Sequence, residues 1–380
     1  MIITKIQLKN WKNFGDVDAI CGKRVFLIGP NASGKSNFLD ALRFLREVAQ
    51  DGLEKAVDAR GGMKAVRYLN ARKLSYVKIV VCLDNKWEYG LSFTSDKGEL
   101  IITEEYVFLT GENGHKTQLL DRPSPEDKQD KLRLTQTAIQ QVNANKSFRE
   151  IADFFKSIEY RHILPQLVRD PKNFSPSPIM NDPYGRDLVM QIWNTRADTR
   201  TSRLKKINEA LSIAVPQLSN LSVEQDKSTG LTHLVVDYKH WRHNASSQKE
   251  ESFSDGTLRL LALLWSIFDA NGPLLLEEPE LSLHEEIVKQ LPSIFARLDR
   301  TRKLKTRQII ITTHSEAMLD TPEIGANEIL RLKPDVEGTV ILTADEQETR
   351  LIEEGLTVAE VLLPKTRPSQ IEQLSIWPTS

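Results

Sequence analysis

The chain has little cysteine and no long apolar segment, and both absences limit the kinds of protein that it can be. Its 380 residues include only two cysteines, Cys21 and Cys82, and neither belongs to a C-x-x-C pair. A disulfide framework and a zinc site on paired thiolates are therefore excluded, and a reducing cytoplasm is the expected location. The longest apolar runs, such as residues 260–265, are far shorter than the ~20 residues that span a bilayer. We expect no membrane partner and no signal peptide.

The charge balance excludes a further class of protein. Lys and Arg number 51 against 52 Asp and Glu, which gives a net charge of −1. This balance excludes a histone-like protein that bulk charge drives onto nucleic acid, although it allows local basic patches. Because 40% of the residues are hydrophobic and 27% are charged, the composition is in the globular range and wholesale disorder is not expected.

The first third of the chain has the pattern of a strand, a turn and a helix, followed by hairpins. Residues 25–28 are an apolar run that ends at Gly29, and large apolar residues recur at helical spacing from Lys35 onward. Three further strand-like segments are separated by short polar turns, which indicates an antiparallel sheet. These segments are Val77–Leu83, Trp87–Phe93 and Leu100–Leu109.

The rest of the chain is predicted to be a helical insertion followed by renewed α/β alternation. The patterns indicate helices over 128–157, 186–213 and 284–298, and two short helices within 346–363. They indicate strands over 219–225, 231–238, 274–276 and 308–312. We therefore expect one α/β sheet whose sequence is split by an insertion.

Residues 29–36 read Gly-Pro-Asn-Ala-Ser-Gly-Lys-Ser and match the phosphate-binding pattern G-x-x-x-x-G-K-[ST] in full. The glycines let the backbone curl until its N–H groups point at phosphate oxygens. Lys35 can reach the β- and γ-phosphates, and the Ser36 hydroxyl can ligate Mg²⁺. A chance match is expected in only about one per cent of chains of this length. The predicted nucleotide contacts are Gly29, Asn31, Ala32, Ser33, Gly34, Lys35, Ser36 and Asn37.

Two adjacent carboxylates, Glu277 and Glu278, follow the apolar strand at 274–276. Side chains alternate between the faces of a strand, so the two groups can have different roles. Glu277 would hold Mg²⁺, and Glu278 would polarise the attacking water. The alternative is a strand that ends in solvated acids.

Two other segments carry candidate phosphate contacts. His314 follows the apolar strand at 308–312, where it can hydrogen-bond a γ-phosphate, although a lone histidine at a strand end is often structural. Ser254, Asp255 and Gly256 precede an apolar helix whose N-terminus offers N–H donors. Under the alternative interpretation, Ser254 or Asp255 is only the N-cap of that helix.

The ordered motifs GPNASGKS, FSDGT, LLLEEPE, LSLH and ITTHS resemble those of ABC-type ATPases of the RecF/SMC branch, over residues 1–45 and 250–345. The resemblance implies an ABC-type ATPase head with a P-loop core sheet, an antiparallel β subdomain and a mainly helical insertion. The implied segments are an N-terminal ATPase lobe over 1–120, the insertion over 121–250, a C-terminal ATPase lobe over 251–345, and helices and a tail over 346–380.

The resemblance also implies residue roles. Ser254, Asp255 and Gly256 would be the signature motif, residues 281–284 the D-loop and His314 the switch histidine. Two heads in that family sandwich two ATP molecules, so a symmetric homodimer follows, with larger assemblies open. Residues 6–14 would be the family's N-terminal strand and a turn, with Lys12 and Asn13, that contacts the nucleotide. Gln166 would be the glutamine that ligates Mg²⁺.

Two positions depart from the family's usual pattern. Glu277 and His284 both stand where aspartate is common, so the metal geometry and the contact between heads are expected to differ. The motifs EEPE and LSLH look more like OLD-type and phage-defence ATPases than like true SMC proteins.

Three functions are compatible with these motifs. The first is an ATPase head that dimerises on ATP and controls a separately encoded nuclease or toxin in anti-phage defence. The second is a RecF-like factor that binds double-stranded DNA during repair or recombination. The third, a transporter subunit, fits poorly with the long insertion and the SDGT signature.

Other features leave alternatives open. Basic clusters at 196–206 and 297–307 are either solvated helix faces or a groove for DNA phosphates. His240 and His243 are expected to lie in a solvated loop. The tail from Pro364 is either a frayed end or a docking segment. No D-x-D pair follows His314, so no second catalytic centre is expected.

Overall fold

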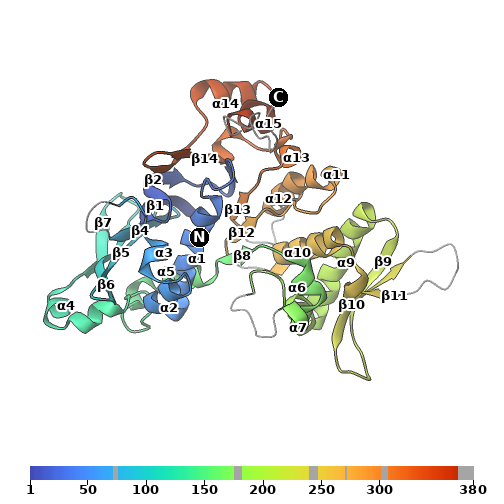
Figure 1. Ribbon diagram of the computed structural model, residues 1–380, viewed down its shortest axis with the longest axis horizontal. Helices are drawn as coiled ribbons and strands as arrows, with labels where there is room; N and C mark the ends of the chain where they lie inside the picture. Colours follow the sequence, from blue (N-terminus) through green and yellow to red (C-terminus); the bar gives the residue numbers. More distant parts are fainter. Residues whose placement is uncertain (72–75, 175–181, 239–246, 270–271, 301–306, 367–380) are drawn as a thin grey trace, which may run out of the picture. The chain divides into compact units, whose positions relative to one another are not determined.

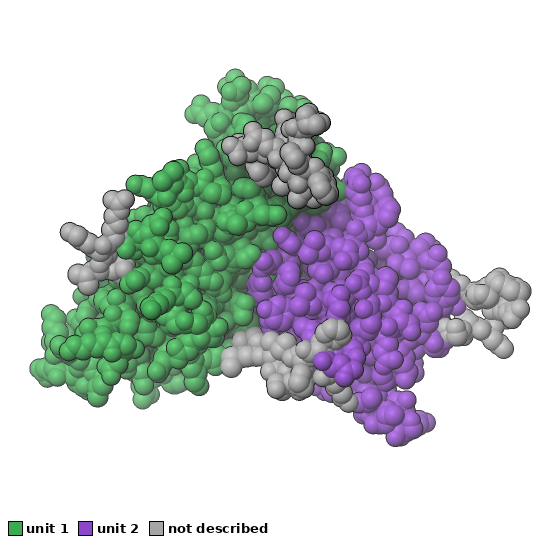
Figure 2. Space-filling view, viewed as in Figure 1, with its two compact units in different colours: residues 1–158, 271–275, 292–380 green, residues 159–270, 276–291 purple. Residues whose placement is uncertain are grey.

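The chain forms two compact units that interleave along the sequence (Figure 2). The computed structural model describes residues 1–71, 76–174, 182–238, 247–269, 272–300 and 307–366. Unit 1 contains residues 1–158, 271–275 and 292–380, and unit 2 contains residues 159–270 and 276–291. None of the helices in the described ranges has both the length and the apolarity needed to cross a membrane. The division at residues 120, 250 and 345 stays a prediction.

The first sheet of unit 1 is antiparallel and contains the predicted hairpins (Figure 1). In order across the sheet its strands are β2 (Phe14–Ile20), β1 (Ile3–Trp11), β4 (Val77–Leu83), β5 (Trp87–Asp96), β6 (Glu99–Thr110) and β7 (Lys116–Arg122). Asp84 and Asn85 have φ values of 52° and 54°, as the two-residue turn between β4 and β5 requires. The three predicted strands and the expected N-terminal strand, β1, are confirmed, and β2 and β7 extend the sheet.

The second sheet of unit 1 has short strands, and the three that apolar runs predicted are almost completely buried. In order they are β15 (Gly338–Leu342), β14 (Ile329–Asp335), β3 (Arg24–Ile28), β13 (Ile309–Thr312) and β12 (Leu274–Glu277), whose last two residues belong to unit 2. Strands β13 and β14 run parallel to β3. The strands predicted at 25–28, 274–276 and 308–312 are confirmed, and their apolar character is typical of buried parallel strands.

The helices of unit 1 agree with the sequence at both ends of the chain. They are α1 (Lys35–Asp51), α2 (Leu53–Asp58), α3 (Met63–Val66), α4 (Pro125–Gln129), α5 (Arg149–Lys156), α12 (Leu291–Arg300), α13 (Glu316–Leu319), α14 (Glu346–Glu353) and α15 (Val358–Val361). The first residue of α12, Leu291, belongs to unit 2. The apolar face predicted after Lys35 is buried on α1. The two short helices predicted within 346–363 are confirmed.

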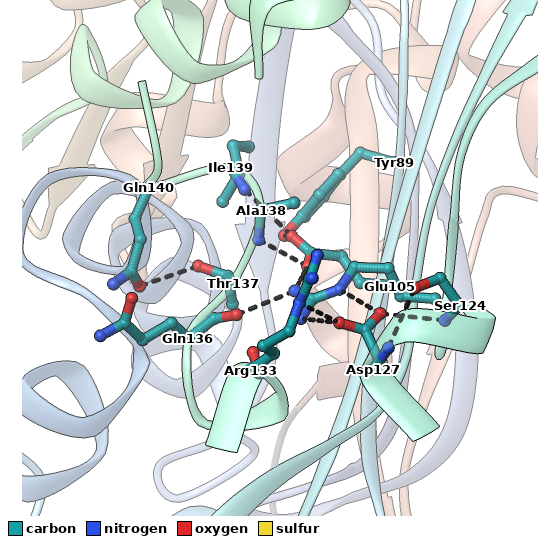
Figure 3. Close-up of polar contacts among 11 residues, drawn as sticks. Tyr89, Glu105, Ser124, Asp127, Arg133, Gln136, Thr137, Ala138, Ile139 and Gln140 are labelled. Carbon is teal, nitrogen blue, oxygen red and sulfur yellow. Dashed lines mark hydrogen bonds and ion pairs between the residues drawn. The ribbon is translucent and has the colours of Figure 1, made fainter. Parts of the chain in front are cut away.

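The helix predicted over residues 128–157 is broken into short pieces, and a buried carboxylate on β6 explains the break (Figure 3). Glu105 is completely buried and accepts hydrogen bonds from the Tyr89 hydroxyl and from the backbone N–H groups of Ala138 and Ile139. Because these N–H groups point at Glu105, they cannot bond to carbonyls one turn back in a helix. Burial raises the pKa of Glu105, although these hydrogen bonds and Arg122 oppose that shift.

Arg122, at the end of β7, completes this buried cluster. Its guanidinium donates to Glu105 at 3.0 Å, to both carboxylate oxygens of Asp127 at 3.0 and 3.1 Å, and to the carbonyl oxygens of Arg133 and Gln136. All five of its N–H donors therefore have partners. Hydrogen bonds from Arg122 hold the pKa of Asp127 well below its usual value.

Unit 2 combines helices with a small antiparallel sheet. The helices are α6 (Pro165–Arg169), α7 (Pro171–Phe174), α8 (Leu188–Asn194), α9 (Ala197–Ala214), α10 (Asp255–Asp269) and α11 (Glu285–Val288). The strands are β8 (Glu159–Arg161), which follows β12 in the strand order, and β11 (Ser247–Lys249), β10 (Thr232–Tyr238) and β9 (Leu218–Gln225). The strands predicted at 219–225 and 231–238 are confirmed. The helices predicted over 186–213 and 284–298 are each divided in two.

The first predicted basic cluster lies along α9 and covers aromatic rings. Arg203 lies over Trp265 at 5.3 Å, and Lys206 lies over Phe268 at 5.6 Å from the ring centre. These cations shield apolar surface within unit 2. Most of the second basic cluster, together with His240, His243 and the tail beyond residue 366, lies outside the residues whose side chains are described.

Candidate functional site

The P-loop connects β3 to α1 in a conformation that only glycine permits at its ends. A Cβ atom on Gly29 would lie 2.4 Å from the carbonyl oxygen of Leu332, and Gly34 has a φ of 98°. Ala32 also lies in the left-handed region, with a φ of 61°. The loop therefore turns sharply into the N-terminus of the 17-residue helix α1, where aligned N–H groups favour an anion.

Lys35 is buried, with its side chain turned into this loop. Its ammonium group donates to the carbonyl oxygens of Gly29 at 3.0 Å and Pro30 at 3.1 Å. By contrast, the predicted contacts Asn31, Ala32 and Ser36 are exposed. The loop thus holds a cation beside exposed polar groups, an arrangement suited to a phosphate chain.

Asn13 holds the P-loop in place through its side-chain amide. The amide donates to the Ser33 carbonyl oxygen at 3.0 Å and to the Thr339 hydroxyl at 2.7 Å, and its oxygen accepts from Asn37 at 2.7 Å. Thr339, on β15, also donates to the Ser33 carbonyl oxygen at 2.8 Å. A Cβ atom on Gly34 would collide with Asn13, at 2.1 Å from Nδ2. Sequence reasoning missed Thr339, because a threonine on an edge strand carries no motif.

Lys12, the other predicted contact of the first hairpin, forms a 2.6 Å ion pair with Asp40 on α1. Burial by itself raises the pKa of Asp40, but hydrogen bonds and charge from Arg60 and Lys12 outweigh it and lower that pKa. The contact of Lys12 and Asn13 with a nucleotide stays a prediction.

In unit 2, Ser254 is the N-cap of α10. Its hydroxyl oxygen accepts a hydrogen bond from the Thr257 N–H group at 3.2 Å, so Ser254 caps the helix, and its role as a phosphate contact stays a prediction. Asp255 forms a 2.6 Å ion pair with Arg169 and accepts from the Gln166 amide at 3.4 Å. Gln166 therefore contacts residues 254–256, the predicted signature motif, which we call the signature segment. The role of Gln166 as a metal ligand stays a prediction.

Glu277 and Glu278 lie at the end of β12 in different backbone conformations. The strand ends at Glu277, and Glu278 has a left-handed φ of 42°. The expectation that strand alternation separates the two carboxylates is therefore wrong for Glu278, which lies outside the strand. The hydroxyl group of Tyr160 donates to the Glu277 carboxylate, and His162 Nδ1 lies 3.3 Å from the Glu277 carbonyl oxygen.

The two predicted histidines are both placed at helix starts. His314 is exposed just beyond β13, where Ser315 caps α13. His284 is the N-cap of α11, and its Nδ1 accepts from the Glu286 N–H group at 3.2 Å. A ring nitrogen thus takes the capping role that an aspartate oxygen commonly has at such a position.

Sequence reasoning also missed Arg259, a cation inside the apolar helix α10. Its side chain is buried, and Nε and Nη1 have no hydrogen-bond partner within the described part of the chain. Burial lowers the pKa of Arg259, while the charges of Asp255, Glu280 and Glu278 oppose that shift. Asp255 in the signature segment, and Glu278 and Glu280 in the loop after β12, therefore interact electrostatically with the same buried cation.

His233, Glu250 and Glu251 form a potential metal-ligand set in unit 2. Both Glu250 oxygens have protein partners, since one lies 2.9 Å from His233 Nδ1 and the other accepts from the Leu234 N–H group at 2.8 Å. These contacts tie the turn before the signature segment to β10, which is a sufficient structural role.

The donors predicted for Mg²⁺ suit that ion chemically. Ser36, Glu277 and Gln166 all have side-chain oxygen atoms, the kind of ligand that Mg²⁺ prefers. The donor types therefore agree with the predicted cofactor.

The model of a family described as "AAA domain, putative AbiEii toxin, Type IV TA system" matches residues 24–320. The chain belongs to this family. The match covers the P-loop, the signature segment, the acidic strand end and His314, and it confirms the predicted P-loop ATPase family. No curated protein matches the chain.

A solved structure of an SMC head shares the fold. This structure, described as "Crystal structure of the SmcHead bound to the C-winged helix domain of ScpA", has a TM-score of 0.53 and 17% identity, covering 92% of this chain and 100% of that one. This likeness confirms the predicted α/β fold of an ABC-type ATPase head. An SMC head from Thermotoga maritima has a TM-score of 0.44 and 14% identity, with coverages of 91% and 100%. An Smc head bound to a ScpA domain derived from Pyrococcus furiosus has a TM-score of 0.49 and 14% identity, with coverages of 93% and 98%.

Proposed function

We propose that the protein hydrolyses ATP, dimerises around the nucleotide and regulates a separately encoded effector in anti-phage defence. The observation that carries the ATPase part is the P-loop, in which buried Lys35 is held by the Gly29 and Pro30 carbonyl oxygens. A lysine presented at a helix N-terminus suits the β- and γ-phosphates of ATP.

The proposed chemistry divides the acidic residues by role. Glu277 and Ser36 would hold Mg²⁺, which supplies positive charge that stabilises the phosphate oxygens. Glu278 would accept a proton from the attacking water, and His314 would hydrogen-bond the γ-phosphate. The left-handed backbone at Glu278 supports a separate role, because it directs this carboxylate independently of β12.

The proposed dimer uses the signature segment. Ser254 caps the 15-residue helix α10, whose N-terminus can donate to a γ-phosphate held by a second copy. Because each copy would supply both a P-loop and a signature segment, the interface would be symmetric.

The proposed effector role has its support in the family. The family description names a toxin and a toxin–antitoxin system. We propose a nuclease or toxin as the partner and the cytoplasm as the location. The solved SMC head bound to a winged-helix domain is an example of this fold with a protein partner. Binding of double-stranded DNA is the alternative, and the packing of α9 cations on aromatic rings gives it no support.

The ATPase and dimer proposals are tested with Glu278→Gln, Lys35→Ala and Ser254→Arg proteins. With ATP and Mg²⁺, we expect Glu278→Gln to bind nucleotide, fail to hydrolyse it and run as a dimer in light scattering. Lys35→Ala should not bind ATP, and Ser254→Arg should bind it but stay monomeric. Hydrolysis at the wild-type rate by Glu278→Gln, or full turnover by a monomer, would contradict the mechanism.

The partner is tested by affinity purification of tagged Glu278→Gln protein from its host. A stoichiometric nuclease or toxin would support the effector role, with Lys35→Ala as the control for nucleotide dependence. Recovery of DNA with repair proteins would replace that role with the RecF-like one.

A further inference from the structure

Tyr160 and Glu277 form a side-chain pair at the end of β12. The Tyr160 hydroxyl group donates to Glu277 Oε2, and His162, two residues further on, reaches the Glu277 carbonyl oxygen. Alternate residues of an extended segment point to one side. Arg161 lies between them and donates instead to the Asp182 carbonyl oxygen at 2.9 Å. One side of the β8 segment therefore holds both the side chain and the main chain of Glu277.

We infer that Tyr160 is a positioning residue for the metal ligand Glu277, an inference that rests on the proposed Mg²⁺ and ATP function. A glutamate side chain has one more rotatable bond than aspartate, so its carboxylate needs an additional restraint to hold one orientation. The phenol supplies this restraint at Oε2. Because a carboxylate offers about four acceptor positions on two oxygens, this hydrogen bond is compatible with metal ligation.

The pair also accounts for the glutamate at position 277. An aspartate is shorter by one methylene group, so its carboxylate would be drawn back from the Tyr160 hydroxyl. Tyrosine at position 160 and glutamate at position 277 thus match each other in length. Sequence patterns alone give no sign of this match, since 117 positions separate the two residues.

The same segment continues toward the signature motif through different contacts. Gln166 and Arg169 both donate to Asp255, and Arg169 also donates to the Phe253 carbonyl oxygen at 2.9 Å. Replacing Tyr160 alone leaves these contacts in place. The effect of such a change should therefore be confined to Glu277 and the metal.

The test measures binding of a fluorescent, non-hydrolysable ATP analogue to the full chain, with Mn²⁺ or with EDTA. The ratio of the two dissociation constants gives the metal-dependent gain in affinity. For Tyr160→Phe, we expect this gain to fall by about tenfold, as when other groups that orient metal ligands are removed. The affinity in EDTA should stay unchanged, and Tyr238→Phe, a matched change on β10, should behave as wild type.

A double-mutant cycle separates positioning from a general structural effect. In the Glu277→Asp background the hydrogen bond is already lost, so Tyr160→Phe should cause no further decrease. An unchanged gain for Tyr160→Phe, or an equal loss in both backgrounds, would overturn the inference while leaving the proposed function intact. If the wild-type protein shows no metal-dependent gain, the proposed function and this inference both fail. Thermal unfolding of each variant confirms that the proteins compared are folded.

Discussion

Gly256, in the first turn of α10, lies directly against the carbonyl oxygen of Ser282. A Cβ atom at position 256 would be 2.6 Å from that oxygen, closer than real contacts allow. Ser282 itself has a left-handed φ of 63°, and the Leu283 N–H group donates to the Glu280 carbonyl oxygen at 3.0 Å. The signature segment and the loop after Glu278 are therefore packed backbone against backbone within unit 2.

This contact predicts that Gly256→Ala uncouples the two segments. The methyl group must displace the Ser282 loop, and this shift costs free energy because the atom in the way belongs to the backbone and not to a flexible side chain. We expect ATP binding at the P-loop to persist while ATP turnover falls by about tenfold or more, which corresponds to roughly 1.4 kcal/mol. Steady-state ATPase assays and nucleotide titration measure the two effects. Gly22→Ala is the control, since its nearest neighbour would lie 3.6 Å away, and an active Gly256→Ala protein would refute the coupling.

The hydrogen bonds of Asn13 predict an indirect effect on nucleotide binding. Asn13→Ala removes three hydrogen bonds that hold Ser33, Asn37 and Thr339. We expect a loss of about 1–2 kcal/mol in unfolding free energy and weaker ATP binding. Urea unfolding and nucleotide titration check both. Thr339→Val, which removes the other hydrogen bond to the Ser33 carbonyl oxygen, should weaken ATP binding in the same direction. If only Asn13→Ala does so, Asn13 acts by touching the nucleotide directly.

The features that could be predicted from the sequence are those that local patterns determine. Strand β3 and helix α1 were predictable because an apolar run, a glycine turn and helical spacing follow one another within 30 residues. The hairpins of β4 to β6 were predictable because their turns are short and polar. The motif order predicted the family for the same reason.

The features that escaped prediction depend on partners far apart in the sequence. The break in the helix over 128–157 depends on Glu105, which draws the Ala138 and Ile139 N–H groups away from helical bonding. The support of the P-loop by Thr339 crosses 306 positions. A burial pattern reports which side chains face inward, but it does not say which polar group meets which.

The buried cluster around Arg122 predicts a large effect on stability. Arg122→Met leaves the buried Glu105 carboxylate without its cation and leaves Asp127 with only the half-exposed Arg133. We expect a loss of about 3–5 kcal/mol in unfolding free energy, measured by urea denaturation. Arg133→Met is the control, because the Arg133 side chain is half exposed and its ion pair with Asp127 should contribute under about 1 kcal/mol. Similar losses for the two variants would contradict the assignment of the cluster to Arg122.

The ion pairs of Glu348 predict how stability depends on pH. Burial by itself raises the pKa of Glu348, but hydrogen bonds from Lys365, from the Asp345 N–H group and from Arg331 outweigh it and lower the pKa from 4.5 to about 2. Because the folded pKa lies below the unfolded one, the unfolded chain binds the proton more readily. The contribution of Glu348 is therefore complete above pH 5 and lost as the pH falls toward about 2, with a size of roughly 3 kcal/mol.

Comparison with Glu348→Gln isolates this group from the other carboxylates that titrate in the same range. The unfolding free energies of the two proteins are measured by urea denaturation at pH values between 2 and 7. We expect the wild-type protein to be the more stable above pH 5, with the difference shrinking steadily below pH 4.5. A difference that stays constant with pH would show that the negative charge of Glu348 does not stabilise the folded protein. The ion pairs of Glu348 with Arg331 and Lys365 would then make no contribution to stability.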